Sequence, residues 1–175
     1  MNYIVTDRLI LRGWNDADRP VFAEINGNDR VMRYFPSVLS PEESNCLADR
    51  IISEFNACNY GLFAVEEKES EEFIGFVGLH RFNFEAPFSP GLEIGWRLSD
   101  KSWGRGYATE AASACIEYAR RHMLTERLYA FTSVHNTPSE NVMKRIGMAK
   151  VGHFGHPALP DGHWLKEHVL YAIDL

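Results

Sequence analysis

Residues 103–110 read Trp103-Gly104-Arg105-Gly106-Tyr107-Ala108-Thr109-Glu110, a glycine-rich turn that joins two different patterns. The preceding residues 91–98 are apolar and β-prone, which predicts a strand. The residues that follow place apolar side chains at helical spacing: Ala108, Ala111, Ala112, Cys115, Ile116, Ala119 and Met123. This order of strand, turn and helix predicts a helix whose N-terminus opens directly at the turn.

The turn has the composition of an anion-binding site. The first N–H groups of a helix have no partner within it, and the aligned peptide dipoles place about half a positive charge there. The residues that enter this helix are Gly104, Arg105 and Gly106, none of which has a typical capping side chain. The glycines leave room for a diphosphate to reach the backbone, and Arg105 adds a charge. The alternative is that the glycines serve only the conformation of the turn.

Strand and helix patterns continue along the whole chain. Strands are predicted at 4–11, 62–65, 73–79, 91–98, 128–134, 150–154 and 169–173. Besides the helix after the turn, helices are predicted at about 15–26, 40–59 and 137–147. Ser40-Pro41-Glu42-Glu43 and Thr137-Pro138-Ser139-Glu140 have the capping pattern that starts a helix. No repeat or linker is visible, so residues 1–175 are predicted to form a single domain.

Composition excludes several classes of function. The chain has 175 residues, 45% of them hydrophobic and 13% aromatic, which fits one folded domain and excludes intrinsic disorder. The net charge of −6, without a basic patch, argues against a nucleic-acid partner. No apolar run approaches the roughly 18 residues that span a bilayer, and the first residues lack the pattern of a secretory signal. We therefore expect no membrane partner and a cytoplasmic location.

The histidines and cysteines do not suggest a metal site. Four of the seven histidines lie near the C-terminus, at His153, His156, His163 and His168. Their spacing lacks the i, i+4 pair of a helical zinc site, and no cysteine accompanies them. The three cysteines are odd in number and have no CxxC spacing, which favours reduced thiols. We predict that no metal is bound.

Three further segments accompany the glycine turn: Thr6 to Arg12, Glu93-Ile94-Gly95-Trp96, and Asn136 through Gly147. Together with the turn they resemble the GNAT superfamily of N-acetyltransferases. The signature of that superfamily is Gln or Arg, two residues, Gly, one residue, then Gly or Ala, and Trp103 stands here at the first position. With Trp at this position, the turn resembles that of the branch that includes the ribosomal-protein N-terminal acetyltransferases. The resemblance covers nearly the whole chain, whereas the turn lacks the Lys-Ser of a P-loop and the third glycine of GxGxxG.

The resemblance implies an α/β (α+β) fold, with a twisted, mixed and mostly antiparallel sheet of about seven strands flanked by about four helices. It implies acetyl-CoA as co-substrate, with the pyrophosphate on the loop amides and Arg105 near the phosphates. The strand 93–98 would splay away from its neighbour, so that pantetheine pairs with its backbone, while Asn136 would steady the CoA arm. The implied cofactor-binding residues are Trp96, Arg97, Leu98, Trp103, Gly104, Arg105, Gly106, Tyr107, Ala108, Thr109 and Asn136.

The implied reaction is direct attack of a primary amine on the thioester carbonyl, through a tetrahedral intermediate. Glu93 is the candidate that accepts the proton of the amine through water; the alternative is that it simply faces solvent. Many family members place a donor Tyr four residues beyond Ser139, where this chain has Met143. Ser139 is therefore the candidate donor to the leaving sulfur, with a local hydrogen bond in the first turn of its helix as the alternative.

The sequence leaves the acceptor open. A protein or peptide N-terminus, an amino acid, a polyamine and an aminoglycoside all fit, and the acyl group could differ from acetyl. The departures at Trp103 and Met143 keep a second hypothesis open, a CoA-binding regulatory module without catalysis. The acceptor pocket is expected to be lined by Trp14, Asn26, Arg33, Tyr34, Phe35 and the loop 81–88. Members of the superfamily often pair, so the resemblance implies a homodimer as one option, with no interface predicted.

Overall fold

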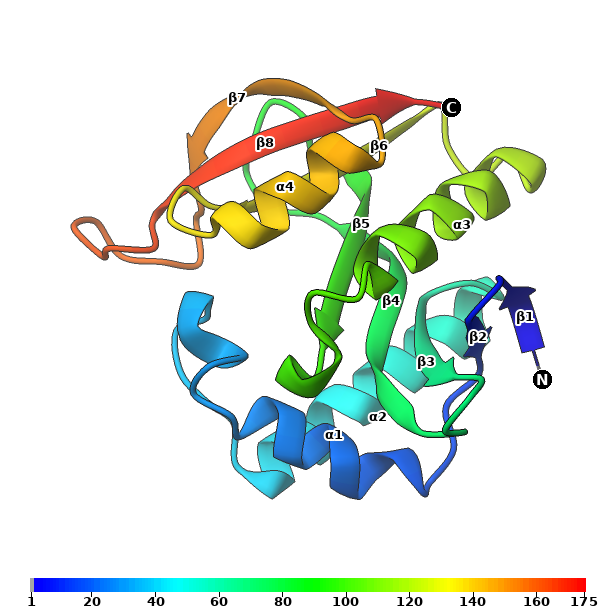
Figure 1. Ribbon diagram of the computed structural model, residues 1–175. Coiled ribbons are helices and arrows are strands. Elements are labelled where there is room, and N and C mark those ends of the chain that lie inside the picture. The colour runs from blue at the N-terminus through cyan, green and yellow to red at the C-terminus, as the bar shows by residue number, and fades with distance from the viewer. Residues whose placement is uncertain (1) are drawn as a thin grey trace.

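The computed structural model describes residues 2–175, which form an open sheet with helices on both of its faces (Figure 1). The strands are β1 (Asn2–Val5), β2 (Leu9–Arg12), β3 (Leu62–Glu67), β4 (Phe73–Phe82), β5 (Gly91–Leu98), β6 (Arg127–Ser133), β7 (Ala149–Gly155) and β8 (Glu167–Asp174). The helices are α1 (Asp18–Asn26), α2 (Pro41–Cys58), α3 (Tyr107–Arg121) and α4 (Thr137–Arg145), with short 3-10 helices η1 (Met32–Tyr34) and η2 (Asp100–Ser102). The order in the sheet is β1-β2-β3-β4-β5-β6-β8-β7, and only β5 and β6 pair in parallel within this described range. The predicted fold class is confirmed.

The segment predicted as one strand at 4–11 is in fact two strands, which makes eight in total. The backbone N–H of Leu9 donates to Thr6 Oγ1 at 3.0 Å, and the N–H of Thr6 donates to the Leu9 carbonyl at 3.0 Å. These bonds close a turn, and β1 folds back on β2 with Val5 opposite Ile10. Because the apolar alternation continues across the turn, the pattern alone did not reveal it.

The two capping patterns have different outcomes. Ser40 caps α2 as predicted: its hydroxyl accepts the N–H of Glu43 at 3.2 Å, and its own N–H donates to Glu43 Oε2 at 2.8 Å. Helix α4 starts at Thr137 as expected, but Thr137 is not its cap. The cap is Asn136, whose side chain accepts the backbone N–H of Ser139, and a Pro follows in the first turn of the helix.

Two apolar clusters attach the helices to opposite faces of the sheet. Helix α3 buries Ala111 and Cys115 against β4 and β5 on one face. On the other face, Phe22 of α1 and Ile51 of α2 pack with Phe76 of β4. In Figure 1, α1 and α2 lie on one side of β4 and α3 lies on the other. Strands β4 and β5 are thus packed against α3 on one face of the sheet, and β4 is packed against α1 and α2 on the other.

Strands β5 and β6 separate after a short contact. Their register pairs only Leu92 with Leu128 and Glu93 with Tyr129. On its other side, β5 pairs with β4 all the way to Leu98. One edge of β5 from Ile94 onward therefore has no strand partner within residues 2–175, and the sheet opens there.

Candidate active site

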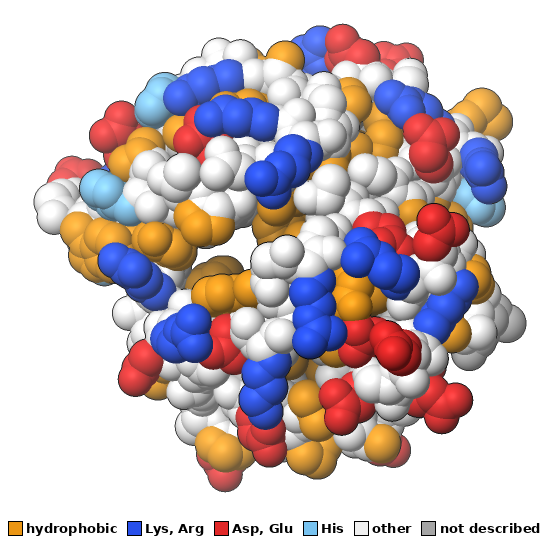
Figure 2. Space-filling view, viewed as in Figure 1, with side chains coloured by type: hydrophobic (Ala, Val, Ile, Leu, Met, Phe, Trp, Pro, Cys, Tyr) orange, Lys and Arg blue, Asp and Glu red, His pale blue; other side chains and the backbone are white. Residues whose placement is uncertain are grey.

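A cleft of about 1640 Å³ occupies the opening between β5 and β6. Figure 2 shows it as a hollow in the surface with hydrophobic side chains inside and Lys and Arg side chains around it. Its volume is sufficient for a cofactor-sized molecule together with a second substrate. All the site residues predicted from the sequence line this cleft: Glu93, Trp96, Arg97, Leu98, Trp103, Gly104, Arg105, Gly106, Tyr107, Ala108, Thr109, Asn136 and Ser139.

The glycine turn presents free backbone N–H groups to one part of the cleft. Gly106 is the N-cap of α3 with a φ of 81°, and no side chain caps this helix. Gly104 has a φ of 75°, and a Cβ added there would meet nothing within 4 Å. Both glycines therefore use the left-handed backbone region that other residues avoid. The uncapped and sterically open helix N-terminus agrees with the expectation, while its ligand stays a prediction.

A contact that the sequence did not reveal holds this turn in place. Glu110, in the first turn of α3, accepts hydrogen bonds from Thr6 Oγ1 at 2.6 Å and from Arg8 Nε at 2.7 Å. The Arg8 guanidinium also donates to the carbonyl of Arg105 at 2.9 Å. Glu110 and Arg8 thus tie the turn between β1 and β2 to the glycine turn. The partners are about a hundred residues apart in the sequence, so spacing gave no signal.

The guanidinium of Arg105, in the glycine turn, is already paired with a carboxylate. Its guanidinium donates to Glu67 Oε1 at 3.1 Å, and the hydroxyl of Tyr107 donates to the same oxygen. Hydrogen bonds from Tyr107 and Ser70, together with the charge of Arg105, hold the pKa of Glu67 below its ordinary value. The backbone N–H groups are therefore the main free positive feature of the turn.

Trp103, which stands where the family signature has Gln or Arg, connects the turn to β5. Its indole Nε1 donates to the Leu98 carbonyl at 3.0 Å, and its ring is 47% exposed. Leu98 itself is buried, and Trp96 packs against the core on the α3 side of the sheet. The end of β5 and the glycine turn are thereby held beside each other, so the unpaired edge of β5 leads directly to the start of α3.

Glu93 lines the middle of the cleft, and its carboxyl group forms no hydrogen bond or ion pair with any residue in the described part of the chain. Burial raises the pKa of Glu93 to about 8, because the carboxylate has lost water without gaining a partner. The residue directly opposite on β4 is His80, whose Nδ1 lies 2.7 Å from Glu54 Oε2. Glu93 is partly exposed in the cleft, and a raised pKa is typical of acid–base groups.

The start of α4 forms the opposite wall. Asn136 Oδ1 accepts the N–H of Ser139 at 3.3 Å, and Asn136 Nδ2 donates to Thr132 Oγ1 at 3.0 Å. The side-chain amide of Asn136 is thus engaged in the turn, and Ser139 lines the cleft. Met143 is 1% exposed and belongs to the core, although it also reaches the cleft wall. No titratable group replaces the absent Tyr at that position.

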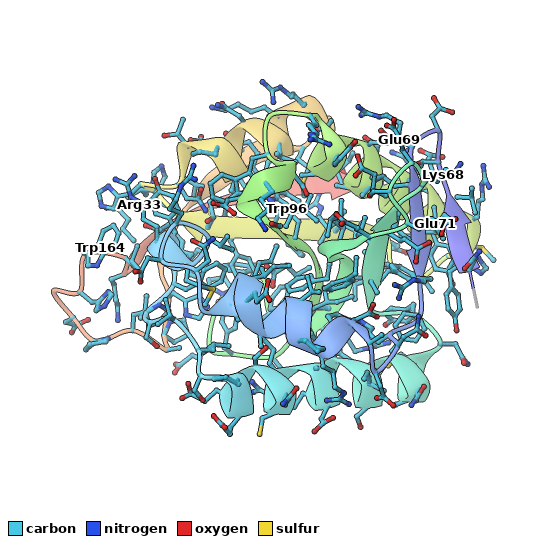
Figure 3. The ribbon with its side chains drawn as sticks, turned by 60° about the horizontal axis from the view of Figure 1, so that its bottom comes forward. Arg33, Lys68, Glu69, Glu71, Trp96 and Trp164 are labelled. Atoms are coloured by element: carbon cyan, nitrogen blue, oxygen red, sulfur yellow. The ribbon has the colours of Figure 1, made fainter. Side chains whose placement is uncertain are left out.

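The far end of the cleft differs partly from the expected acceptor pocket. Arg33, Tyr34 and Phe35 line it as expected, and Tyr34 lies 6.4 Å from the ring of Trp164 on the connection between β7 and β8. Figure 3 shows Arg33 and Trp164 close together at this end, with Trp96 nearer the middle. Trp14 instead packs under α1 among the phenylalanines of that core.

Two further expectations for this end are wrong. Asn26 is 0% exposed and lies behind the cleft wall. The loop 81–88 packs Phe84 and Phe88 onto Phe131 rather than lining the cleft.

Two histidines that the sequence did not assign to the site line this end. His156 and His168 lie with ring centroids 5.0 Å apart beside Phe131. Burial lowers the pKa of His168 to about 4 and lowers that of His156 as well, so both are neutral at pH 7. Among residues 2–175 no group of three or more His, Cys, Asp and Glu is arranged to hold a metal ion. In the same range, no helix has the length and apolar character needed to cross a bilayer.

Comparisons with known proteins agree with this geometry. The family model described as "Acetyltransferase (GNAT) domain" matches residues 8–149. An uncharacterized N-acetyltransferase, YnaD of Bacillus subtilis, is 30% identical over 98% of this chain and 96% of its own length. The [ribosomal protein uS5]-alanine N-acetyltransferase of Escherichia coli is 30% identical over 97% of this chain and 89% of its own length. A crystal structure of a GNAT-family acetyltransferase from Bacillus anthracis superposes with a TM-score of 0.80 at 27% identity, covering 98% of this chain and 97% of that one. The chain therefore belongs to the GNAT family and is an acetyltransferase.

Proposed function

We propose that this protein transfers the acetyl group of acetyl-CoA to the nitrogen of a primary amine. The observation that carries the proposal is the uncapped start of α3 beside the unpaired edge of β5, in one continuous cleft. A diphosphate fits the first feature because free N–H groups and the helix dipole attract anions. An extended, amide-containing arm fits the second because a strand edge offers free backbone donors and acceptors.

In this proposal the pyrophosphate of acetyl-CoA binds at the N–H groups of residues 104–109. The open space at Gly104 supports the placement, because a phosphate can approach the backbone there without steric conflict. The pantetheine arm pairs with β5 at Trp96, Arg97 and Leu98, and Asn136 contacts the arm from α4. At Leu98 the carbonyl already accepts a hydrogen bond from the indole of Trp103, so less of the backbone is available to the arm there.

Glu93 is the proposed general base. Its pKa of about 8 places its proton affinity near that of an ammonium group, so it can take up the proton of the acceptor through a water molecule. The neutral amine then attacks the carbonyl carbon, and a β5 backbone N–H stabilises the oxyanion. The C–S bond breaks as the intermediate collapses, and the hydroxyl of Ser139 donates a hydrogen bond to the departing thiolate. The second proton that the nitrogen must lose passes to this thiolate, so that CoA leaves as the free thiol.

The reaction can be tested by following free thiol release from acetyl-CoA with a thiol-reactive dye, over a panel of peptides and small amines. We expect thiol release that depends on the amine, with the acetylated amine detected by mass spectrometry in equal amount. Tight CoA binding without turnover on any amine would instead support a binding module. Competition between acetyl-CoA and longer acyl-CoA species determines the acyl preference.

A further inference from the structure

The side chain of Arg97 lies on the same face of β5 as Glu93, away from the α3 core. Its Nη1 donates to Asn26 Oδ1 at 2.6 Å, and the guanidinium carbon lies 4.2 Å from the ring centroid of Phe35. Asn26 is fully buried and donates in turn to Ser44 Oγ at 2.8 Å. The guanidinium is therefore held in one orientation by a neutral amide and an aromatic ring.

This cation lacks a counter-charge. No carboxylate within the described residues forms an ion pair with Arg97, and its Nε is buried without any hydrogen-bond acceptor. Burial lowers the pKa of Arg97 to about 10, which still leaves it charged at neutral pH. Buried charges in proteins are normally paired, since an unpaired one is costly. An unpaired cation beside a substrate cleft is accordingly a candidate for binding an anion.

The surface of β5 between the Glu93 carboxyl group and the Arg97 guanidinium is open. Gly95 stands between Glu93 and Arg97 on this face of β5, and a Cβ added to it would meet only Glu93 Oε1, at 3.9 Å. The side chains of Arg33 and Arg50 also line the cleft and raise its positive potential. A polycationic acceptor such as a polyamine or an aminoglycoside would be repelled here.

We propose that the acceptor is a small amine that also carries an anionic group, a carboxylate or a phosphate, and that Arg97 binds this group while the amine lies over Gly95 beside Glu93. The proposal rests on the proposed acetyl transfer and narrows its substrate class. A planar guanidinium suits either anion, because both accept two parallel hydrogen bonds.

The test measures binding and turnover on matched pairs of amines that differ only in the anionic group: β-alanine with β-alaninamide, and phosphoethanolamine with ethanolamine. Binding is measured by calorimetry on the protein saturated with CoA, so that it does not depend on turnover, and affinities are corrected for the fraction of free amine. We expect the anionic member of at least one pair to bind about tenfold or more tightly. The pair with the larger preference identifies carboxylate or phosphate as the group.

Three variants isolate the role of Arg97. Arg97→Gln should reduce the preference to about one, Arg97→Lys should retain part of it, and Arg121→Gln, an equal loss of charge on the exposed end of α3, should retain all of it. Circular dichroism verifies that each variant is folded. Equal affinity within both pairs for the wild-type protein, or an unchanged preference in Arg97→Gln, would overturn the proposal.

The outcome also separates this inference from the proposed function. Binding that depends on Arg97 without any thiol release would contradict acetyl transfer and leave the anion site in place. Thiol release with equal kcat/KM for the two members of each pair would support acetyl transfer and contradict the anion site.

Discussion

The glycine turn and the face of β5 that carries Glu93 and Arg97 present different chemical groups to the cleft. At the glycine turn the charged side chains are paired with one another, Arg8 with Glu110 and Arg105 with Glu67, and only backbone N–H groups are free. On the face of β5 that carries Glu93, the side chains of Glu93 and Arg97 form no ion pair with any described residue. One region offers fixed dipoles and the other offers groups that titrate.

In the proposed reaction this difference separates the binding of acetyl-CoA from the chemistry of the acceptor. A backbone cradle has no ionisable group, so its affinity for a diphosphate should depend little on pH near neutrality. A face that contains Glu93, with its pKa of about 8, should make the chemical step depend strongly on pH. Variants at the two places should accordingly affect different steps.

The largest expected effect comes from Gly106→Asp, which breaks the first region. The substitution places a carboxylate at a position with a φ of 81° and against the incoming diphosphate. We expect CoA affinity, measured by calorimetry, to fall at least about 100-fold. Gly162→Asp is the matched control, because Gly162 also has a φ of 81°, with nothing within 4 Å of an added Cβ, and does not line the cleft. CoA affinity that survives Gly106→Asp would contradict the cradle.

Glu93→Gln changes the face of β5 that carries Glu93 and should leave the glycine turn unaffected. The amide keeps the shape of the side chain but cannot accept a proton, so kcat/KM should fall about 100-fold while CoA affinity is unchanged. Glu69→Gln, at an exposed turn that does not line the cleft, is the matched control. A variant with full activity would remove Glu93 from the mechanism.

The pH profile sharpens the same point. As the proposed base, Glu93 would act only when it is deprotonated, so kcat/KM of the wild-type protein should rise as the pH increases through about 8. The acceptor must be an amine that is already neutral across the range, since its own ionisation would otherwise contribute. Glu93→Gln should lose this rise, and a profile that is the same in both proteins would assign the ionisation elsewhere.

Glu93→Gln, which should lower activity, should raise the free energy of unfolding at high pH. The pKa of Glu93 is raised on folding from 4.5 to about 8, so the unfolded chain loses its proton first and the folded state loses stability as the pH rises between these values. Glu93→Gln should remove this cost and unfold later in urea at pH 8.5, by on the order of 2 kcal/mol. At pH 4.5 the two proteins should differ little. A stabilising effect of equal size at both pH values would mean that ionisation of Glu93 is not its cause.

Ser139→Ala should have the smallest effect. In the proposed reaction its hydroxyl donates a hydrogen bond to the leaving thiolate and is not the base, so we expect kcat to fall about fivefold to tenfold with unchanged CoA affinity. Ser53→Ala on the exposed face of α2 is the control. An acetyl donor with a less basic leaving thiol should recover part of the loss, and absence of both effects would leave Ser139 with a structural role.

The first region could be predicted from the sequence, and the second only in part. The glycine turn and α3 are local, because backbone conformation and helix spacing determine them over about twenty residues. The contacts that hold the turn join Arg8 to Glu110 and Tyr107 to Glu67, across distances at which spacing carries no information. The turn at Thr6 was missed because apolar alternation continues through it.

The ionisation of the second region required the three-dimensional structure. The sequence identified Glu93 as a candidate, but its pKa depends on burial, and the unpaired state of Arg97 depends on where Asn26 and Phe35 lie. His156 and His168 resemble surface loop residues in the sequence and become cleft residues only when β7 and β8 pair beside β6. These properties arise from tertiary packing rather than from local pattern.

A crystal structure of the protein with CoA tests the central claim most directly. The account predicts pyrophosphate oxygens within hydrogen-bonding distance of the N–H groups of residues 104–109, with the pantetheine arm running along the free edge of β5 toward Glu93. Density for CoA elsewhere on the molecule, with the glycine turn empty, would contradict it.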